Sequence, residues 1–150
     1  MTRRQTQEAR TRKTLRVDDW MAGVVHTVKP KTDVLHARAT LENERINQLP
    51  VVVNGKLVGI ITDRDLRDAF PSVFASARHP GDALAKINVE EVMTRDVFTV
   101  APGDSVIDAA RLMRKERVGA VPVVDGTALV GIITRSDLLD ALSAMASGEL

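Results

Sequence analysis

The chain contains no cysteine and no tyrosine, and aromatic residues make up only 3% of its 150 positions. The lack of cysteine excludes disulfides, zinc–thiolate sites and thiol catalysis, and it is compatible with a reducing cytosol. No apolar run is long enough to cross a bilayer, and the N-terminus lacks the apolar core of a secretory signal. We therefore expect a cytoplasmic protein with no membrane partner.

Net charge is also low, at +1, which does not favour a nucleic-acid partner for the chain as a whole. Residues 1–16 nevertheless contain six basic side chains and one acidic one, Glu8. We expect a disordered basic arm at 1–16, with contact to phosphates or to an acidic partner as the alternative. The arm has no aromatic residue on which bases could stack, which argues against nucleic acid.

An internal repeat fills most of the chain. The segment Gly59-Ile60-Ile61-Thr62 returns 72 positions later as Gly131-Ile132-Ile133-Thr134, and Asp65 returns as Asp137. From residue 17 to residue 69, 23 of 53 positions are identical to the position 72 further on, without a gap. One structural unit is therefore used twice, so any site should occur twice about a pseudo-two-fold axis.

Each repeat predicts the same series of elements. A short amphipathic turn at 17–21 and 89–93 precedes a strand at 24–28 and 97–100. A helix comes next, and its predicted cap is Thr32 or Asp33 in repeat 1 and Ser105 in repeat 2. Two strands follow, at 50–53 and 57–62 in repeat 1 and at 122–124 and 128–134 in repeat 2. Asn54-Gly55 and Asp125-Gly126-Thr127 form the turns, and a last helix follows each Thr.

No catalytic constellation is present. The sequence has no HExxH motif, Walker loop, GxSxG or GxGxxG, and the repeat does not preserve His26 or His36. We expect no metal site and no enzyme.

The duplicated Thr-x-x-Asp is the stronger candidate for chemistry. It matches a variant of the helix capping box, which by itself binds nothing. A strand that runs directly into a helix N-terminus, however, also suits a phosphate, and an acid in that first turn can accept two hydrogen bonds from a ribose diol. Arg64 and Arg135 lie beside the motif and could neutralise phosphate charge, although their spacing from Thr differs by one residue.

The repeat resembles the CBS domain, and the pair resembles a Bateman module. The resemblance rests on Val-x-x-x-Met, on Thr-Val-x-Pro at 27–30 and 99–102, on Leu-Pro-Val-Val at 49–52 with Val-Pro-Val-Val at 121–124, and on Gly-Ile-Ile-Thr-x-x-Asp. The stretch from Ile61 to Phe74 also resembles stand-alone bacterial CBS pairs of the acetoin-utilisation type. The resemblance implies an α+β fold of two β-α-β-β-α units packed sheet to sheet, with two chains in a disc-like homodimer.

The resemblance also implies ligands, namely AMP, ADP, ATP or S-adenosylmethionine, bound between the repeats without any required cofactor. It assigns phosphate and ribose contacts to Thr62, Asp65, Thr134 and Asp137. It assigns the adenine wall to Ile46, Asn47 and Gln48, to Val118, Gly119 and Ala120, and to His26 and Phe98. The larger polar pair Asn47-Gln48, against Gly119-Ala120, predicts unequal sites.

The resulting domain scheme is an arm (1–16), repeat 1 (17–70), a linker (71–88), repeat 2 (89–145) and a tail (146–150). The leading hypothesis is a regulatory, energy-sensing module without catalysis, acting on a client protein in trans. The alternatives are a ligand-free dimerisation scaffold and a nucleic-acid role for the basic arm.

Overall fold

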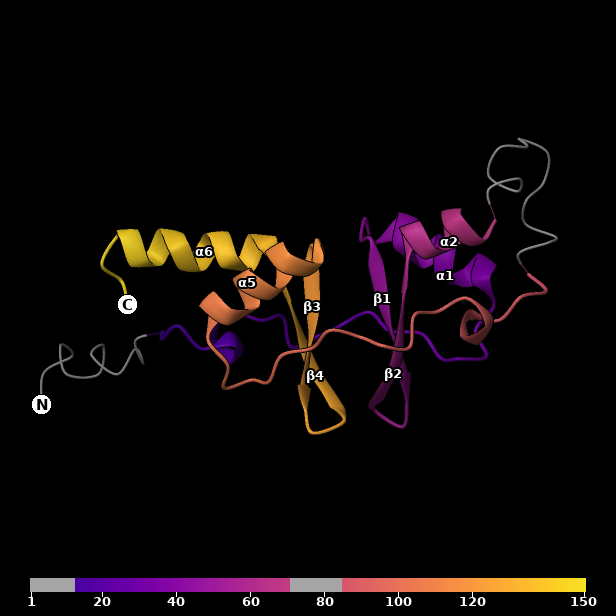
Figure 1. Cartoon of the computed structure of the whole chain (residues 1–150), viewed down its shortest axis with the longest axis horizontal. Helices are drawn as coiled ribbons and strands as arrows, with labels where there is room; N and C mark the ends of the chain where they lie inside the picture. Colours follow the sequence, from indigo (N-terminus) through magenta and orange to yellow (C-terminus); the bar gives the residue numbers. More distant parts are fainter. Residues whose placement is uncertain (1–12, 71–84) are drawn as a thin grey trace, which may run out of the picture.

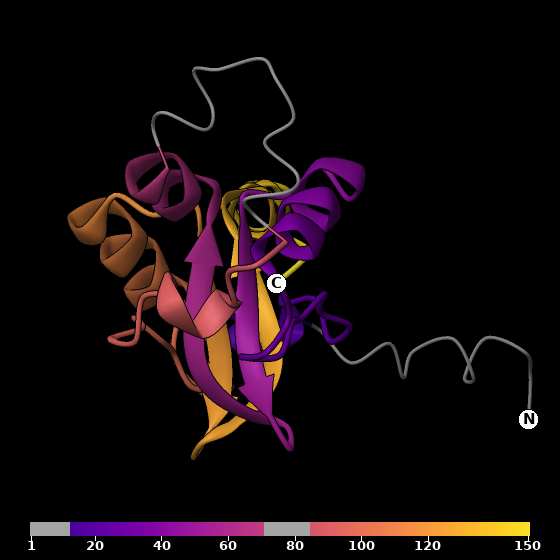
Figure 2. The same cartoon turned by 90° about the vertical axis from the view of Figure 1, so that its right-hand side faces the viewer.

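The structure is a computed structural model that describes residues 13–70 and 85–150. Its strands form two β-hairpins side by side, and the α-helices gather at the end of the hairpins opposite their turns (Figures 1 and 2). The elements, in chain order, are η1 (Val17–Asp19), α1 (Val34–Asn43), β1 (Gln48–Val53), β2 (Lys56–Thr62), α2 (Asp63–Ala69), η2 (Val89–Glu91), α5 (Val106–Glu116), β3 (Ala120–Asp125), β4 (Ala128–Thr134) and α6 (Arg135–Ala146). The predicted α+β fold of tandem repeats is confirmed. Residues 1–12 of the predicted arm and 71–84 of the predicted linker lie outside the described residues.

The two hairpin turns differ in type. Asn54 and Gly55 both take left-handed φ angles, +49° and +77°, as a type I′ turn requires. In the second hairpin Asp125 pairs with Ala128, so the turn is Gly126-Thr127 and Asp125 belongs to β3 rather than to the predicted turn. Gly126 has a φ of +64°, which fits a type II′ turn with glycine at its first central position.

The hairpins join in one antiparallel sheet of order β1-β2-β4-β3. The β2–β4 link consists of one residue pair, Lys56 with Ala128, close to both turns. The amide of Leu57 donates to the carbonyl of Thr127 across this link, at 3.0 Å. In Figure 2 one hairpin lies behind the other with its broad face toward the viewer, as the predicted sheet-to-sheet packing implies, and the described strands of the two hairpins pair with each other close to their turns.

The predicted first strands are reduced to single bridges. At 24–28 only Val28 pairs, in parallel with Val51, and at 97–100 only Val100 pairs, in parallel with Val123. The rest of each segment has no strand assignment and no ladder partner among the described residues, and Val24 lies in a bend. The β-branched composition therefore overestimated the pairing.

Each repeat sends its first segment into the other half of the molecule. Val17 is fully buried in the core of Val106, Val121 and Ile133, and Val89 is fully buried in the core of Val34, Leu49 and Ile61. Ala22 bridges to Ile132 of β4, and Thr94 bridges to Ile60 of β2. Each hydrophobic core therefore needs a segment from both repeats.

The helices begin at the predicted caps. The carboxylate of Asp33 accepts a hydrogen bond from the amide of His36 at 2.9 Å, and Ser105 Oγ accepts from the amide of Ile107 at 3.1 Å. Beyond the other ends of α1 and α5, Arg45 and Arg117 adopt left-handed φ angles of +53° and +55°. The helices thus end at equivalent places before β1 and β3.

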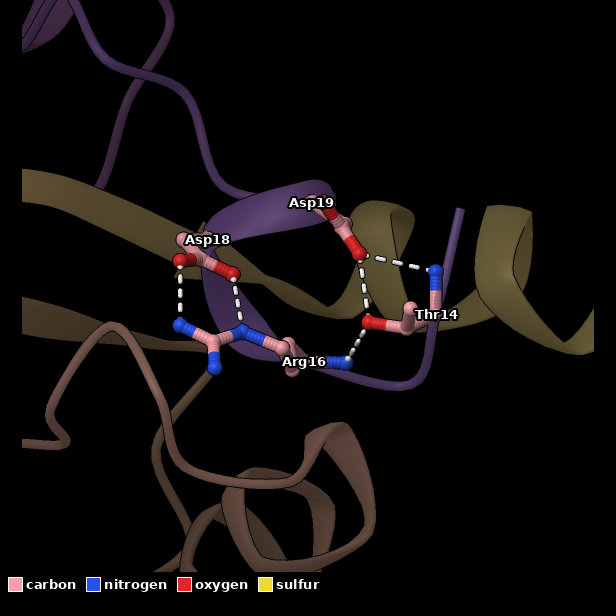
Figure 3. A network of polar contacts seen from close by, with 4 residues as sticks. All are labelled: Thr14, Arg16, Asp18 and Asp19. Atoms are coloured by element: carbon pink, nitrogen blue, oxygen red, sulfur yellow. Dashed lines mark hydrogen bonds and ion pairs between the residues drawn. The ribbon is translucent and has the colours of Figure 1, made fainter. Parts of the chain in front are cut away.

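The N-terminal segment is anchored earlier than predicted. Leu15 packs on the second core, and Arg16 bridges to Ser105. Figure 3 shows Arg16 donating two hydrogen bonds to the carboxylate of Asp18, at 3.0 and 2.8 Å, while Thr14 donates to Asp19. Residues 13–16 are therefore part of the fold, although the prediction placed them in a disordered arm.

Candidate functional site

The predicted Thr-x-x-Asp motif of repeat 1 forms a capping box where β2 meets α2. Thr62 Oγ1 accepts a hydrogen bond from the amide of Asp65 at 2.9 Å, and Asp65 Oδ2 accepts from the amide of Thr62 at 3.0 Å. Both side chains are half-buried. The box satisfies two backbone donors of the first helical turn and fixes the carboxylate at the helix N-terminus.

The equivalent box in repeat 2 places its carboxylate differently. Asp137 Oδ2 accepts from both the amide and the hydroxyl of Thr134, at 2.7 and 3.0 Å. The other oxygen, Oδ1, has no hydrogen-bond partner in the described part of the chain. Asp137 therefore keeps one carboxylate oxygen available to an incoming hydroxyl group.

Repeat 1 lacks this free oxygen because of Thr94. The hydroxyl of Thr94 donates to Asp65 Oδ1 at 3.2 Å, from the segment that repeat 2 sends across to β2. Residue Ala22 stands 72 positions before Thr94 and has no hydroxyl, so the contact has no counterpart at Asp137. The sequence interpretation missed Thr94. The signal that could have identified it is the change from Ala22 to Thr94 directly after the repeated methionines Met21 and Met93.

The predicted adenine-wall segments lie beside the box of their own repeat. The amide of Asp63 donates to the carbonyl of Asn47 at 3.0 Å, and Gln48 pairs with Thr62. In repeat 2 the amide of Arg135 donates to the carbonyl of Gly119 at 3.1 Å, and Ala120 pairs with Thr134. The backbone of the loop that leads into β1 or β3 thus lies directly beside each box.

Within these segments the side chains have different surroundings. Ile46 packs against the first core and Val118 against the second, so these side chains anchor the loops to the cores. Asn47 and Gly119 are exposed, and Gln48 is half-buried. The larger side chains of Asn47 and Gln48, compared with Gly119 and Ala120, therefore alter the part of the loop that a ligand could contact.

Among the described residues, four of the predicted site residues form no hydrogen bond or ion pair with the carboxylates of the boxes. His26 Nε2 lies 3.3 Å from Glu44 Oε2 just beyond α1, and Phe98 is 46% exposed. Arg64 pairs with Asp68 on the surface of α2 at 3.7 Å. The guanidinium carbon of Arg135 lies 3.7 Å from where a β-carbon on Gly119 would stand, so this side chain covers the loop.

The repeated glycines before the boxes have a structural explanation. A β-carbon on Gly59 would lie 2.6 Å from Met93 Sδ and 3.0 Å from the carbonyl oxygen of Thr94. On Gly131 it would lie 2.5 Å from Met21 Sδ and 2.8 Å from the carbonyl oxygen of Ala22. Glycine therefore lets the exchanged segment of the other repeat approach the strand that leads into each box.

The chemistry available at these boxes is hydrogen bonding. Each offers a carboxylate, a hydroxyl, main-chain groups and the N-terminus of a helix, which together suit a diol and an anion. Across residues 13–70 and 85–150, no three His, Asp or Glu side chains are arranged to hold a metal ion. Nor is any helix of these ranges long and apolar enough to span a membrane.

Comparison with known proteins gives two family matches, both to the CBS domain, at residues 17–72 and 89–144. AcuB from Vibrio cholerae, which is named as an acetoin utilization protein, superposes with a TM-score of 0.73 at 31% identity, over 89% of this chain and 94% of that one. The CBSX2 structure in complex with AMP has a TM-score of 0.73 at 28% identity, over 88% and 99% of the two chains. The CBS domain pair of protein MJ0100, in complex with 5′-methylthioadenosine and S-adenosyl-L-methionine, has a TM-score of 0.69 at 32% identity, over 87% and 97%.

Proposed function

This chain belongs to the CBS domain family and carries a pair of such domains. We therefore propose that it is a regulatory module that binds adenosine-containing ligands without catalysing a reaction. Two related pairs of similar length are described with AMP and with S-adenosylmethionine and methylthioadenosine. The resemblance to stand-alone pairs extends over most of the chain. We propose that a bound ligand acts by changing how the chain contacts a client protein.

The observation that carries the proposal is the paired Thr–Asp box at a strand–helix junction. Each carboxylate is half-buried and fixed by the backbone, so its orientation is set before a ligand arrives. A ribose would donate its two hydroxyl groups to Asp65 or Asp137, and phosphate would approach Thr62 or Thr134 at the helix N-terminus. The loops at Ile46–Gln48 and Val118–Ala120 would then frame the base.

The two boxes should differ in affinity. Asp137 has a free carboxylate oxygen, whereas a ligand at Asp65 must displace the hydroxyl of Thr94 or share it. We expect the repeat 2 site to bind first and more tightly. Regulation then follows only if the ligand prefers one arrangement of the chain over another.

The exposed apolar face of α6 favours a second candidate function, that of a homodimerisation scaffold without a ligand. Leu139, Leu142 and Met145 of α6 are exposed apolar side chains on a helix whose other face packs on the core. Under this alternative the boxes serve only as helix caps, and ligand panels produce no response.

A thermal-shift panel separates the two functions. Purified chain would be melted with AMP, ADP, ATP, S-adenosylmethionine and GTP, and any response followed by calorimetry. A single site filled at 100 times its dissociation constant adds about 2.7 kcal/mol of stability. A response to adenosine ligands and not to GTP supports the sensor; a flat panel with nucleotide-free protein supports the scaffold.

A further inference from the structure

A pocket of about 360 Å³ lies between α5 and the first turn of α6, in the half that holds β3 and β4. Three arginines and an apolar floor line it: Arg114, Arg117 and Arg135 above Ala110, Met113 and Leu138. Neither Thr134 nor Asp137 is among its lining residues, and no acidic side chain lines it. We call this feature the arginine pocket.

The three guanidinium groups lack partners that would balance their charge. Neighbouring cations on α5 are paired: Arg111 lies 3.7 Å from Asp108, and Lys115 lies 3.9 Å from Glu116. By contrast, none of the three pocket arginines has an ion pair or a side-chain hydrogen bond within the described ranges. Three like charges around one hollow repel one another, and a bound anion would relieve that repulsion.

The backbone holds these side chains around the hollow. Arg117 follows α5 in the left-handed conformation, and Arg135 opens α6 while its guanidinium group lies against Gly119. The N-terminal end of the dipole of α6, a helix of 12 residues, adds partial positive charge on the same side. All three arginines remain exposed and open to a ligand.

The first repeat provides an internal comparison. The positions 72 residues earlier are Glu42, Arg45 and Asp63, which carry two acids where the pocket has arginines. There, Glu42 pairs with Arg38 at 3.1 Å and Asp63 pairs with Arg67 at 3.0 Å. In repeat 2 the counterparts of Arg38 and Arg67 are the apolar residues Ala110 and Leu139. The same place in the fold is neutralised in one repeat and strongly positive in the other.

We propose that the arginine pocket binds a phosphate group that carries at least two negative charges. The planar fork of arginine matches phosphate oxygens, and bonds between ionised partners are the strong ones. The phosphate can belong to a separate small compound or to the polyphosphate tail of a nucleotide held at Thr134 and Asp137. The second case rests on the function proposed above, whereas the first does not.

The test is calorimetry at about 50 mM salt, because the attraction is screened at higher ionic strength. Pyrophosphate, AMP and ATP would be titrated into the wild-type chain, into an Arg114→Gln/Arg117→Gln variant and into an Arg111→Gln control. Thermal melts check that the variants fold. We expect the double variant to weaken pyrophosphate or ATP binding by about tenfold or more, and the control to leave both unchanged.

The titrations separate the two sources of phosphate. Pyrophosphate binding that disappears in the double variant indicates a separate phosphate compound. ATP that binds more tightly than AMP in the wild type, and equally in the double variant, indicates the nucleotide tail. The proposal is overturned if neither pyrophosphate nor ATP loses affinity in the double variant, or if neither binds the wild type. Failure of the proposed function is distinct, because AMP would then not bind while pyrophosphate still does.

Discussion

At the scale of single residues, the glycines before the two boxes show how tightly the repeats interlock. Gly59 and Gly131 stand where the exchanged segment of the other repeat crosses a strand, and added atoms would meet both a flexible methionine and a rigid backbone carbonyl. In the sequence this glycine repeats together with the Thr-x-x-Asp motif, which suggests a shared role in ligand binding. The contacts around Gly59 and Gly131 instead show that the glycine permits the packing on which the motif depends.

We predict that Gly131→Ala destabilises the fold by about 1–3 kcal/mol and that Gly59→Ala has a smaller effect. The methionine sulfur can move aside in both, but the carbonyl of Ala22 is 2.8 Å from the new carbon, against 3.0 Å for that of Thr94. Urea denaturation measures both variants. Gly23→Ala is the control, since nothing lies within 4 Å of its added carbon. Equal stability of Gly131→Ala and the wild type would contradict the packing.

Thr94 is the second residue with a testable role. In Thr94→Ala the Oδ1 atom of Asp65 loses its hydroxyl partner and becomes as available as that of Asp137. We expect the affinity of the weaker adenosine site to rise several-fold, because breaking a hydrogen bond of about 1 kcal/mol no longer opposes binding. Two-site calorimetry measures this change, with Thr99→Ala as the matched control. A weaker second site would instead show that the Thr94 hydroxyl contacts the ligand.

At the scale of elements, the helix caps combine stability with a pH dependence. Asp33 caps α1, and its pKa lies below the ordinary value of 3.8, first because its carboxylate accepts from the amide of His36. A lowered pKa in the folded state means that the cap stabilises above the ordinary value. That contribution is lost as the pH falls through the folded pKa.

Asp33→Ala should therefore cost about 1 kcal/mol at pH 5, and the difference from the wild type should shrink as the pH falls from 4 toward 3. Asp33→Asn, which caps without titrating, should keep most of the stability and lose this part of the pH dependence. Thermal melts between pH 5 and pH 3 measure all three chains. A constant gap between wild type and Asp33→Ala down to pH 3 would contradict the assignment.

Most elements follow from local sequence signals. Ser105 and Asp33 mark helix starts, Asn54-Gly55 marks a tight turn, and Thr62 and Thr134 mark the strand–helix junctions, because each of these depends on contacts within a few residues. The segments at 24–28 and 97–100 were predicted as strands and form single bridges, since pairing depends on a distant partner that the local pattern does not specify.

The site was predictable in part for the same reason. The Thr–Asp boxes connect residues three apart, so the spacing alone predicts them. Thr94 reaches Asp65 from 29 positions away, and the arginine pocket combines two helices with a loop. Such contacts depend on the exchange of segments and on helix packing, which no local pattern encodes.

At the scale of the whole molecule, the two repeats are structurally dependent on each other. Val17 and Met21 belong to the core of the second half, and Val89 and Met93 belong to that of the first. A change at one of the two proposed ligand sites would therefore reach the other half through the exchanged segments, which end beside the boxes at Ala22 and Thr94. This arrangement would provide a direct route for coupling between the two proposed sites.

We predict that neither half folds alone. A fragment of residues 1–84 lacks the segment around Val89, and a fragment of residues 85–150 lacks the segment around Val17, so each exposes part of a core. Circular dichroism should show little cooperative melting for either fragment and a cooperative transition for an equimolar mixture. Independent cooperative folding of both fragments would contradict the interlocked account.

The most direct test of the central claim is calorimetry of AMP and S-adenosylmethionine binding to Asp65→Asn, to Asp137→Asn and to the double variant. Asparagine can still accept the capping hydrogen bond through its one oxygen, but an NH2 donor replaces the second carboxylate oxygen that would accept from a ribose. Asp68→Asn and Asp140→Asn, on the same two helices, are the controls. The account predicts that Asp137→Asn removes the tighter site, that Asp65→Asn removes the weaker one, and that the double variant binds neither ligand. Unchanged affinity and stoichiometry in a folded double variant would contradict it.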